Sequence, residues 1–373
     1  MYFLLIVSYA ICMFIYCLNI KIEYLYVAIP LLFIVPTIFY DPIAAYIYNG
    51  YYVDTVRMFA EMDAMYLSGW EVWTPYDNLI LSKTYLYLFS LTGVNNLLPI
   101  VTCFIVYFLQ SYTIFNLGKY FKATNKQILY ANLIVILMTS YFNVVTNIRY
   151  PLAIALLGYL LMMDLIKQKH RILCFIGYIV IANLHQGVLL VILLRYLSVF
   201  KLKYNIIILV LLCIILNTNF DFLLGMILQN DSGLLLSIAE KQNAYLESDN
   251  GGRSFTFLFR LSCALIDISS ITFSIYLKNR LKKYSSTFDL ITLLGLIGLY
   301  SSFSYTLIGN VLIQRVESIL IIFIAVLSLM EASFKEYNYH ILSSWKLFAL
   351  KASAAFTICY VFFYQLLTLY RSV

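Results

Sequence analysis

The stretch TNIRYPLAIALLGYLLMMDL, residues 146–165, decides the fold class of this chain. After Arg149 it is almost entirely apolar and is long enough to cross about 30 Å of hydrocarbon as a helix. Pro151 suits the first turn of such a helix, where its missing N–H is not needed. An arginine at the edge of a hydrocarbon-spanning helix is costly unless it has a partner. The stretch therefore predicts a membrane-spanning helix with an arginine of functional interest at its mouth.

Composition extends this prediction to the whole chain. Of the 373 residues, 63% are hydrophobic and 12% are charged, and the mean hydropathy is +0.87. A soluble domain carries about twice that charged fraction. The first apolar run lacks a basic segment and a small-residue cleavage site, which favours a retained span over a signal peptide. The seven cysteines lie in apolar runs without a CxxC pair, so neither a disulfide framework nor a zinc site is indicated.

The placement of charge predicts the topology. Basic clusters interrupt the apolar runs and are expected on the cytoplasmic side; they lie at 118–126, 167–171, 201–203, 278–283 and 335–346. Two acidic, aromatic segments alternate with them, at about 41–93 and 219–254, and are expected outside. The net charge of +7 is therefore topological and does not indicate nucleic acid as a partner. Both termini fall outside.

Threading the chain through these clusters predicts one polytopic domain, residues 1–373, with about twelve transmembrane helices. The hairpin at 172–200 is tight, and two short or broken helices meeting near NLHQG would satisfy it. The expected spans are 2–20, 24–40, 94–117, 127–144, 151–166, 172–184, 186–200, 204–218, 255–277, 287–303, 316–332 and 348–369.

Four arginines fall at one depth on the outer side, where the positive-inside tendency disfavours them. They are Arg149, Arg253, Arg260 and Arg315. Each could extend to lipid phosphates. As a group they suit a pyrophosphate at the headgroup of a lipid, because the guanidinium fork matches phosphate oxygens and keeps its charge. In a transfer reaction that pyrophosphate is also the leaving group, whose developing charge they would stabilise without a metal ion.

Further polar residues lie on the same side. His185 is either a core histidine or a general base or hydrogen-bond donor to a sugar. Asp54 and Arg57 are three apart and would share a helix face, as a surface ion pair or facing substrate. Glu61 and Asp63 resemble the acidic pair of metal-dependent lipid-linked glycosyltransferases. Lys241 and Tyr245 lie on a loop long enough to form a lid over substrate.

At these residues the chain resembles the Wzy-type O-antigen polymerases, in the broader EpsG-like group of polysaccharide polymerases. The resemblance rests on four short stretches. They are YYVDTVRMF (51–59), NIRYPLAIALLGYLL (147–161), NLHQGVLLVILL (183–194) and IQRVESILIIF (313–323). It implies a GT-C-like fold in the bacterial inner membrane, with the active site facing the periplasm. By the same resemblance Arg149 and Arg315 contact pyrophosphate, and His185 and Asp54 hold or orient the acceptor.

The activity so implied is the transfer of a glycan from undecaprenyl pyrophosphate onto the next lipid-linked repeat unit. Single displacement would invert the anomeric carbon, and no metal or other cofactor is expected. Donor and acceptor are both lipid-linked oligosaccharides, and membrane lipids and a chain-length regulator protein are further implied partners. Alternatives are a lipid-linked oligosaccharide flippase, an O-antigen ligase and a membrane acyltransferase.

Overall fold

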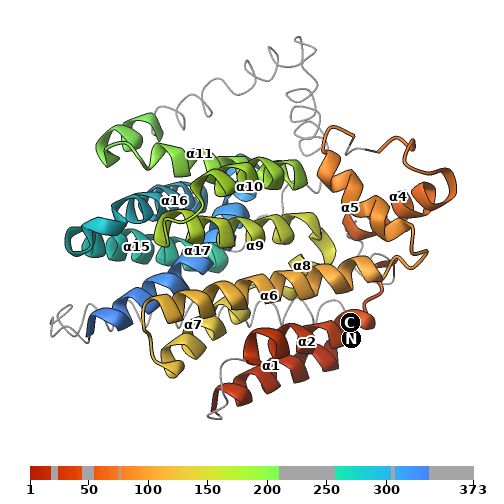
Figure 1. Ribbon diagram of the computed structural model, residues 1–373, viewed down its shortest axis with the longest axis horizontal. Helices are drawn as coiled ribbons and strands as arrows, with labels where there is room; N and C mark the ends of the chain where they lie inside the picture. The colour runs from red at the N-terminus through yellow and green to blue at the C-terminus, as the bar shows by residue number, and fades with distance from the viewer. Residues whose placement is uncertain (18–23, 44–53, 75–76, 210–256, 304–306, 336–373) are drawn as a thin grey trace, which may run out of the picture. The chain divides into compact units, whose positions relative to one another are not determined.

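The computed structural model (Figure 1) describes residues 1–17, 24–43, 54–74, 77–209, 257–303 and 307–335. Within these ranges the regular elements are all helices, so the predicted all-α class is confirmed. Four helical stretches have the length and hydropathy to cross a membrane, and a bent helix pair makes a fifth if it counts as one span. The chain is thus a helical membrane protein. The four are Leu97–Tyr120, Arg149–Ile166, Arg260–Asn279 and Lys282–Phe303.

The chain divides into two compact units, Met1–Leu189 with Ser318–Val373, and Leu190–Glu317. The twelve-span count and the single domain stay predictions. The helices of the first unit up to Leu189 begin and end close to the predicted spans, except α4 and α5, which lie within the predicted outer segment 41–93. They are α1 (Tyr2–Cys17), α2 (Leu25–Ile38), α4 (Asp54–Ser68), α5 (Ile80–Ser90), α6 (Leu97–Tyr120), α7 (Asn125–Met138), α8 (Tyr141–Asn147), α9 (Arg149–Leu161), η2 (Met162–Ile166), α10 (Arg171–Leu184) and η3 (Gln186–Val188).

Helix α6 is the central element of the first unit, in contact with α2, α7, α8 and α9. Figure 1 shows it running alongside α7 and α9. Phe33 of α2 stacks on Tyr107 of α6, with ring centroids 4.2 Å apart, and both rings are buried. Such aromatic pairs add dispersion and quadrupole attraction to the apolar packing. Because the backbone groups within each helix are already hydrogen-bonded to one another, side-chain contacts of this kind hold α2 and α6 together.

The predicted span 127–144 is broken into two helices. Helix α7 begins with a capping box between Thr124 and Gln127, and α8 begins with Ser140 accepting from the backbone N–H of Asn143. The two helices are bent by 56°. A serine hydroxyl that satisfies an N-terminal N–H favours a new helix start. This local cap explains why the apolar pattern alone did not reveal the break.

The predicted outer segment 41–93 contains two ordered helices, α4 and α5, which pack on each other through a cluster of buried methionines and leucines. Thr55 anchors α4 on α8, donating to the backbone carbonyls of Val145 and Thr146 at 2.7 and 2.8 Å. Both carbonyls lie near the C-terminal end of α8, where intrahelical donors run out. The two helices are therefore a fixed part of the unit. The other predicted outer segment, 219–254, lies outside the described residues.

The second unit contains α11 (Leu189–Leu197) from Leu190 onward, α15 (Phe257–Arg280), η4 (Lys282–Tyr284), α16 (Ser285–Phe303) and the start of α17 (Leu307–Lys335). Helices α15 and α16 pack closely along their lengths. A hydroxyl pair, Ser274 with Thr292 at 2.8 Å, joins them in the interior. Inside a membrane such hydrogen bonds between helices supply specificity that apolar contacts lack.

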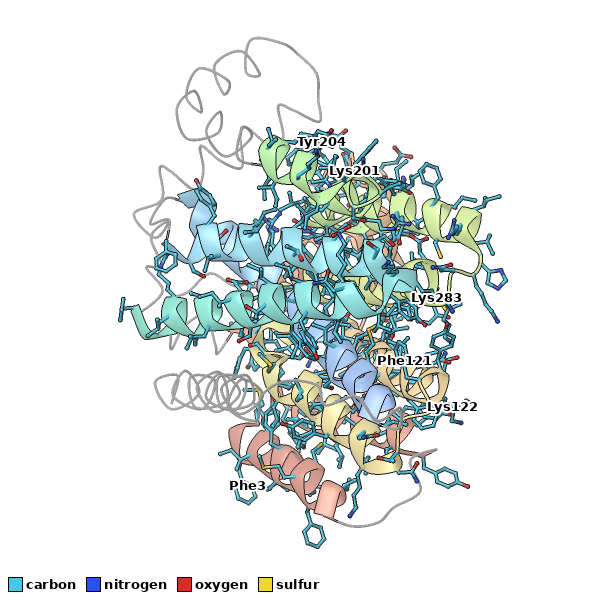
Figure 2. All side chains as sticks on the ribbon, turned by 90° about the vertical axis from the view of Figure 1, so that its left-hand side faces the viewer. Phe3, Phe121, Lys122, Lys201, Tyr204 and Lys283 are labelled. Atoms are coloured by element: carbon cyan, nitrogen blue, oxygen red, sulfur yellow. The ribbon has the colours of Figure 1, made fainter. Side chains whose placement is uncertain are left out.

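Large apolar side chains lie on the outside of several helices, as expected of a surface that faces lipid. Phe3 of α1 is 76% exposed and points away from its helix (Figure 2). Ile172 and Leu173 of α10 are similarly exposed. The labelled basic residues Lys122 and Lys283 lie at helix ends and connections, in agreement with the predicted charge pattern (Figure 2).

Candidate functional site

Arg149 follows an unusual one-residue connection between two helices. Helix α8 ends at Asn147 and α9 begins at Arg149, so one residue, Ile148, makes the turn with φ 33° and ψ −71°. A positive φ is costly for a β-branched residue, and such strain concentrates at functional sites. Ile148 is fully buried, and its side chain packs in the hydrophobic cluster under α4 and α5. This packing holds the residue in its strained backbone conformation. Pro151 lies in the first turn of α9, as predicted.

The side chain of Arg149 is drawn inward rather than out to lipid phosphates. The residue is only 6% exposed, and its Nη1 donates to Ser82 Oγ of α5 at 3.4 Å. Ser82 in turn donates to the carbonyl of Leu184 at the end of α10, at 2.5 Å. One serine therefore links α5, α9 and α10 beside the guanidinium. A buried arginine held this way is positioned for a ligand or a carboxylate.

Helix α4 brings three charged side chains to the same place. Arg57 Nη2 lies 3.1 Å from Asp54 Oδ1, and Arg57 Nε lies 3.6 Å from Glu61 Oε1. The predicted shared face of Asp54 and Arg57 is confirmed, and Glu61 extends it by one turn. Arg149 also acts electrostatically on Glu61. We call Asp54, Arg57, Glu61, Ser82, Arg149, Tyr150 and His185 the Arg149 cluster.

Glu61 has the most unusual acidity of the cluster. Burial raises its pKa from 4.5 to about 7, against the lowering effect of Arg57 and Arg149 and with a smaller raising effect of Asp54. Within the described residues its Oε2 has no hydrogen-bond partner. A carboxyl group with a near-neutral pKa and an uncommitted oxygen is suited to take a proton from a substrate hydroxyl.

His185 lies at the predicted break in the hairpin. It ends α10 in an extended conformation, and its Nδ1 accepts the backbone N–H of Gly187 at 2.9 Å. Its ring lies against Tyr150 of α9, with centroids 5.2 Å apart. Because Nδ1 is an acceptor, the neutral ring carries its proton on Nε2. The histidine is thereby suited to donate a hydrogen bond, which favours the donor role over the role of base.

The other predicted site residues are distributed differently. Arg260 belongs to the second unit, is buried, and donates through Nη1 to the carbonyls of Ser301 and Ser302 at 3.2 and 3.4 Å. Those carbonyls lie at the C-terminal end of α16, where a positive charge is favourable. Arg315 also belongs to the second unit and is partly exposed. Lys241, Tyr245 and Arg253 lie outside the described residues.

The predicted acidic pair does not converge. Asp63 is two residues beyond Glu61, on another side of α4, where it accepts from Asn95 Nδ2 at 2.8 Å in an exposed position. Residues two apart on a helix do not face each other. Across the described ranges, no three His, Cys, Asp or Glu side chains gather as a possible metal site.

Glu61, Ser82 and Tyr150 are members of the cluster that sequence reasoning did not place there. For Glu61 the signal was present, since Asp54, Arg57 and Glu61 follow the three-and-four spacing of one helix face. Ser82 and Tyr150 carried no such signal. A serine within α5 and a tyrosine beside Arg149 gain a role only from the packing of α5, α9 and α10.

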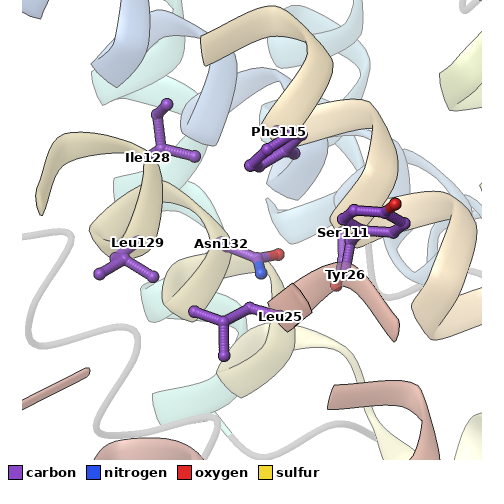
Figure 3. Close-up of a pocket in the computed structure, with 7 residues that line it drawn as sticks. All are labelled: Leu25, Tyr26, Ser111, Phe115, Ile128, Leu129 and Asn132. Atoms are coloured by element: carbon purple, nitrogen blue, oxygen red, sulfur yellow. The ribbon is translucent and has the colours of Figure 1, made fainter. Parts of the chain in front are cut away.

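A small cavity in the first unit lies apart from the cluster, between α2, α6 and α7 (Figure 3). Its volume of about 10 Å³ is room for about one water molecule. Ser111 Oγ and Asn132 Oδ1 line it, and neither has a hydrogen-bond partner within the described part of the chain. The cavity can hold a bridging water between α6 and α7, and it is too small for a sugar.

Comparisons with family models, curated proteins and solved structures found no match to the chain. Assignment of a function therefore depends on the chemistry of the Arg149 cluster and on the four stretches of sequence quoted above.

Proposed function

We propose that the protein is a polysaccharide polymerase of the Wzy type, an enzyme that joins lipid-linked repeat units in a bacterial inner membrane. It transfers the growing glycan from undecaprenyl pyrophosphate onto the next lipid-linked unit at the periplasmic face. The proposal includes the predicted twelve crossings and the GT-C-like architecture. The observation that carries it is the gathering of Arg57, Arg149 and Glu61 at the start of a candidate membrane span.

The two guanidiniums support recognition of a pyrophosphate. Arg149 is buried beside Ser82 and acts electrostatically on the carboxyl of Glu61. Arg57 of α4 contacts the same carboxyl. Each offers a planar fork that matches two phosphate oxygens, and each stays charged when water is removed. A pyrophosphate entering the cluster would compete with Glu61 and Asp54 for these forks. Arginine pairing with substrate would then release the carboxyl of Glu61 for proton transfer.

The chemical step we propose is one displacement. The acceptor hydroxyl oxygen attacks the anomeric carbon of the donor glycan while its proton passes to Glu61. The bond from that carbon to the pyrophosphate oxygen breaks, and the leaving group departs with the electron pair. Arg149 and Arg57 stabilise the negative charge that develops, and Nε2–H of His185 orients a sugar hydroxyl. Inversion at the anomeric carbon follows from a single displacement.

The direct experiment gives purified protein a synthetic undecaprenyl pyrophosphate oligosaccharide and analyses lipid and glycan products by mass spectrometry. The expected products are glycans of two or more repeats and free undecaprenyl pyrophosphate, formed with or without a chelator. Arg149→Ala should give neither product, whereas Arg171→Ala, an exposed arginine at the far end of α10, should give both. Failure of the wild-type protein to release undecaprenyl pyrophosphate from any lipid-linked oligosaccharide would refute the proposal.

A deletion strain separates the alternatives. Loss of a polymerase leaves lipopolysaccharide with a single repeat unit. Loss of a flippase leaves none and traps lipid-linked units in the cytoplasmic leaflet. Loss of a ligase lets long lipid-linked chains accumulate. Only the first outcome agrees with the function proposed here.

A further inference from the structure

Two carboxyl groups are buried together inside the second unit. Asp267 of α15 is 0% exposed and Glu317 of α17 is 7% exposed. Their side chains interact with each other electrostatically. Gly298 of α16 faces Asp267 so closely that a Cβ there would collide with the carboxyl group. The absence of a side chain at Gly298 therefore makes the space in which Asp267 sits.

The surroundings of this pair do not neutralise it through hydrogen bonds. Within the described residues none of the four carboxyl oxygens of Asp267 and Glu317 has a hydrogen-bond partner in good geometry. The polar and titratable groups that face the pair are the Cys263 thiol on α15 and the Ser302 hydroxyl on α16. Arg260, two turns before Asp267, directs Nη1 to backbone carbonyls of α16.

Elementary electrostatics limits the charge such a pair can carry. Burying one ionised carboxylate costs several kcal/mol, and placing a second beside it adds like-charge repulsion in a medium of low dielectric constant. Two buried carboxyl groups avoid this repulsion when they share a proton, because only one of them is then ionised and the acid donates a hydrogen bond to the carboxylate. Ionisable residues within membrane helices that lack a compensating partner commonly belong to ion or proton sites.

We propose that Asp267 and Glu317 form a proton-binding site in the membrane interior, in which the two carboxyl groups hold one shared proton at neutral pH. The ligand of this site is the proton itself, and α15, α16 and α17 each contribute a residue to it. The site uses none of the Arg149 cluster, so it stands independently of the polymerase function. Its protonation changes the net charge held between three helices by one unit.

Infrared spectroscopy of the purified protein tests the proposal, because a protonated carboxyl gives a carbonyl band that an ionised one lacks. Wild-type protein at neutral pH should show such a band, shifted in D₂O. The band should be lost or displaced in Glu317→Gln and in Asp267→Asn. Asp289→Asn is the matched control: Asp289 is buried in the same unit but forms an ion pair with Lys278, so its replacement should leave the band unchanged.

A second measurement avoids reliance on variants that fail to fold. Wild-type protein grown with side-chain isotope-labelled aspartate or glutamate should shift the same band in each case, since both residues share the proton. A neutral-pH spectrum without an acid band that depends on these residues would overturn the proposal. Carboxylate bands that instead respond to exchange of Na⁺ for K⁺ would equally overturn it, by assigning the pair to a metal cation.

Discussion

The backbone N–H of Gly187 donates to Nδ1 of His185 at 2.9 Å. This contact orients the imidazole and commits Nδ1 as an acceptor, so the neutral ring presents a proton at Nε2. A histidine held in this tautomer donates a hydrogen bond and does not remove a proton at Nε2. In the reaction proposed above the role of base then passes to Glu61, and the two residues become separable by experiment.

His185→Ala should lower kcat roughly tenfold, about the value of one lost hydrogen bond, while KM for the lipid-linked donor changes little. The pH dependence of the remaining activity should keep the wild-type shape, because the titrating group is elsewhere. Steady-state assays across the pH range would check this. His170→Asn, on the exposed turn before α10, is the control and should leave kcat, KM and the pH profile unchanged. Loss of the pH-dependent limb in His185→Ala would make the histidine the base after all.

Replacing Glu61 should alter the pH profile itself. Its carboxyl has a pKa of about 7, so wild-type activity should rise with pH and level off above that value. Glu61→Gln cannot accept a proton and should lose on the order of 10²-fold or more of kcat, with no remaining rise near neutral pH. Asp63→Asn, exposed and two residues along the same helix, should behave as wild type. An unchanged profile in Glu61→Gln would exclude Glu61 as the base.

Glu61 should also make the stability of the folded protein depend on pH. Because the folded-state pKa of Glu61 is raised from 4.5 to about 7, the folded protein binds more protons than the unfolded one between these values. Its contribution is fully present below pH 4.5 and is lost as pH rises to about 7. The melting temperature of Glu61→Gln should therefore rise relative to that of wild type as the pH increases through that window. Above the window the difference between the two melting temperatures should be constant. A difference independent of pH would contradict this.

Arg149 should not tolerate a change of geometry at constant charge. Arg149→Lys should lose on the order of 10²-fold in activity, because a point charge does not reproduce the two parallel hydrogen bonds of the guanidinium. Arg149→Ala should abolish chain growth. Both proteins should reach wild-type abundance in the membrane, as immunoblots of membrane fractions would show. A collapse in abundance for both variants would indicate that Arg149 serves the fold and not the reaction.

Gly298→Ala should destabilise the second unit by about 1–3 kcal/mol, since the new methyl group overlaps the buried Asp267 carboxyl. Asp267→Ala makes room, so the double variant Gly298→Ala with Asp267→Ala should recover stability relative to Gly298→Ala alone. Asp267→Asn keeps the size of the side chain and should not rescue. Thermal unfolding in detergent distinguishes these cases. Equal stability of both double variants would show that the overlap is not the cause.

The helical class and many helix positions were predictable because apolar runs and basic clusters report directly on a membrane environment. The run that begins near Arg149, the break at His185 and the shared face of Asp54 and Arg57 all follow from such local patterns. The break between α7 and α8 was not predictable from hydropathy, since it depends on the hydroxyl of Ser140 capping a new helix. Local hydrogen bonds of this kind leave the apolar pattern intact.

The site could be predicted only in part. Charged residues on one helix face reveal each other by spacing, so Asp54 and Arg57 were found. Ser82 and Arg149 meet through the packing of helices far apart in the chain, which no spacing encodes. The acidity of Glu61 likewise arises from burial, and the sequence placed it instead in a pair with Asp63. The inward direction of Arg149 could also not be read from its position at a helix mouth.

Helix α10 has a consequence for the bilayer around it. Its 14 residues, Arg171–Leu184, extend about 21 Å, whereas the hydrocarbon layer is about 30 Å thick. With Arg171 among the headgroups of one leaflet, His185 stops about 9 Å short of the opposite headgroups. In that placement, lipids beside this helix would thin locally or admit water to match its length. Under the proposed function, the lipid-linked sugar would then reach His185 at a locally thinned part of the bilayer, below the level of the surrounding headgroups.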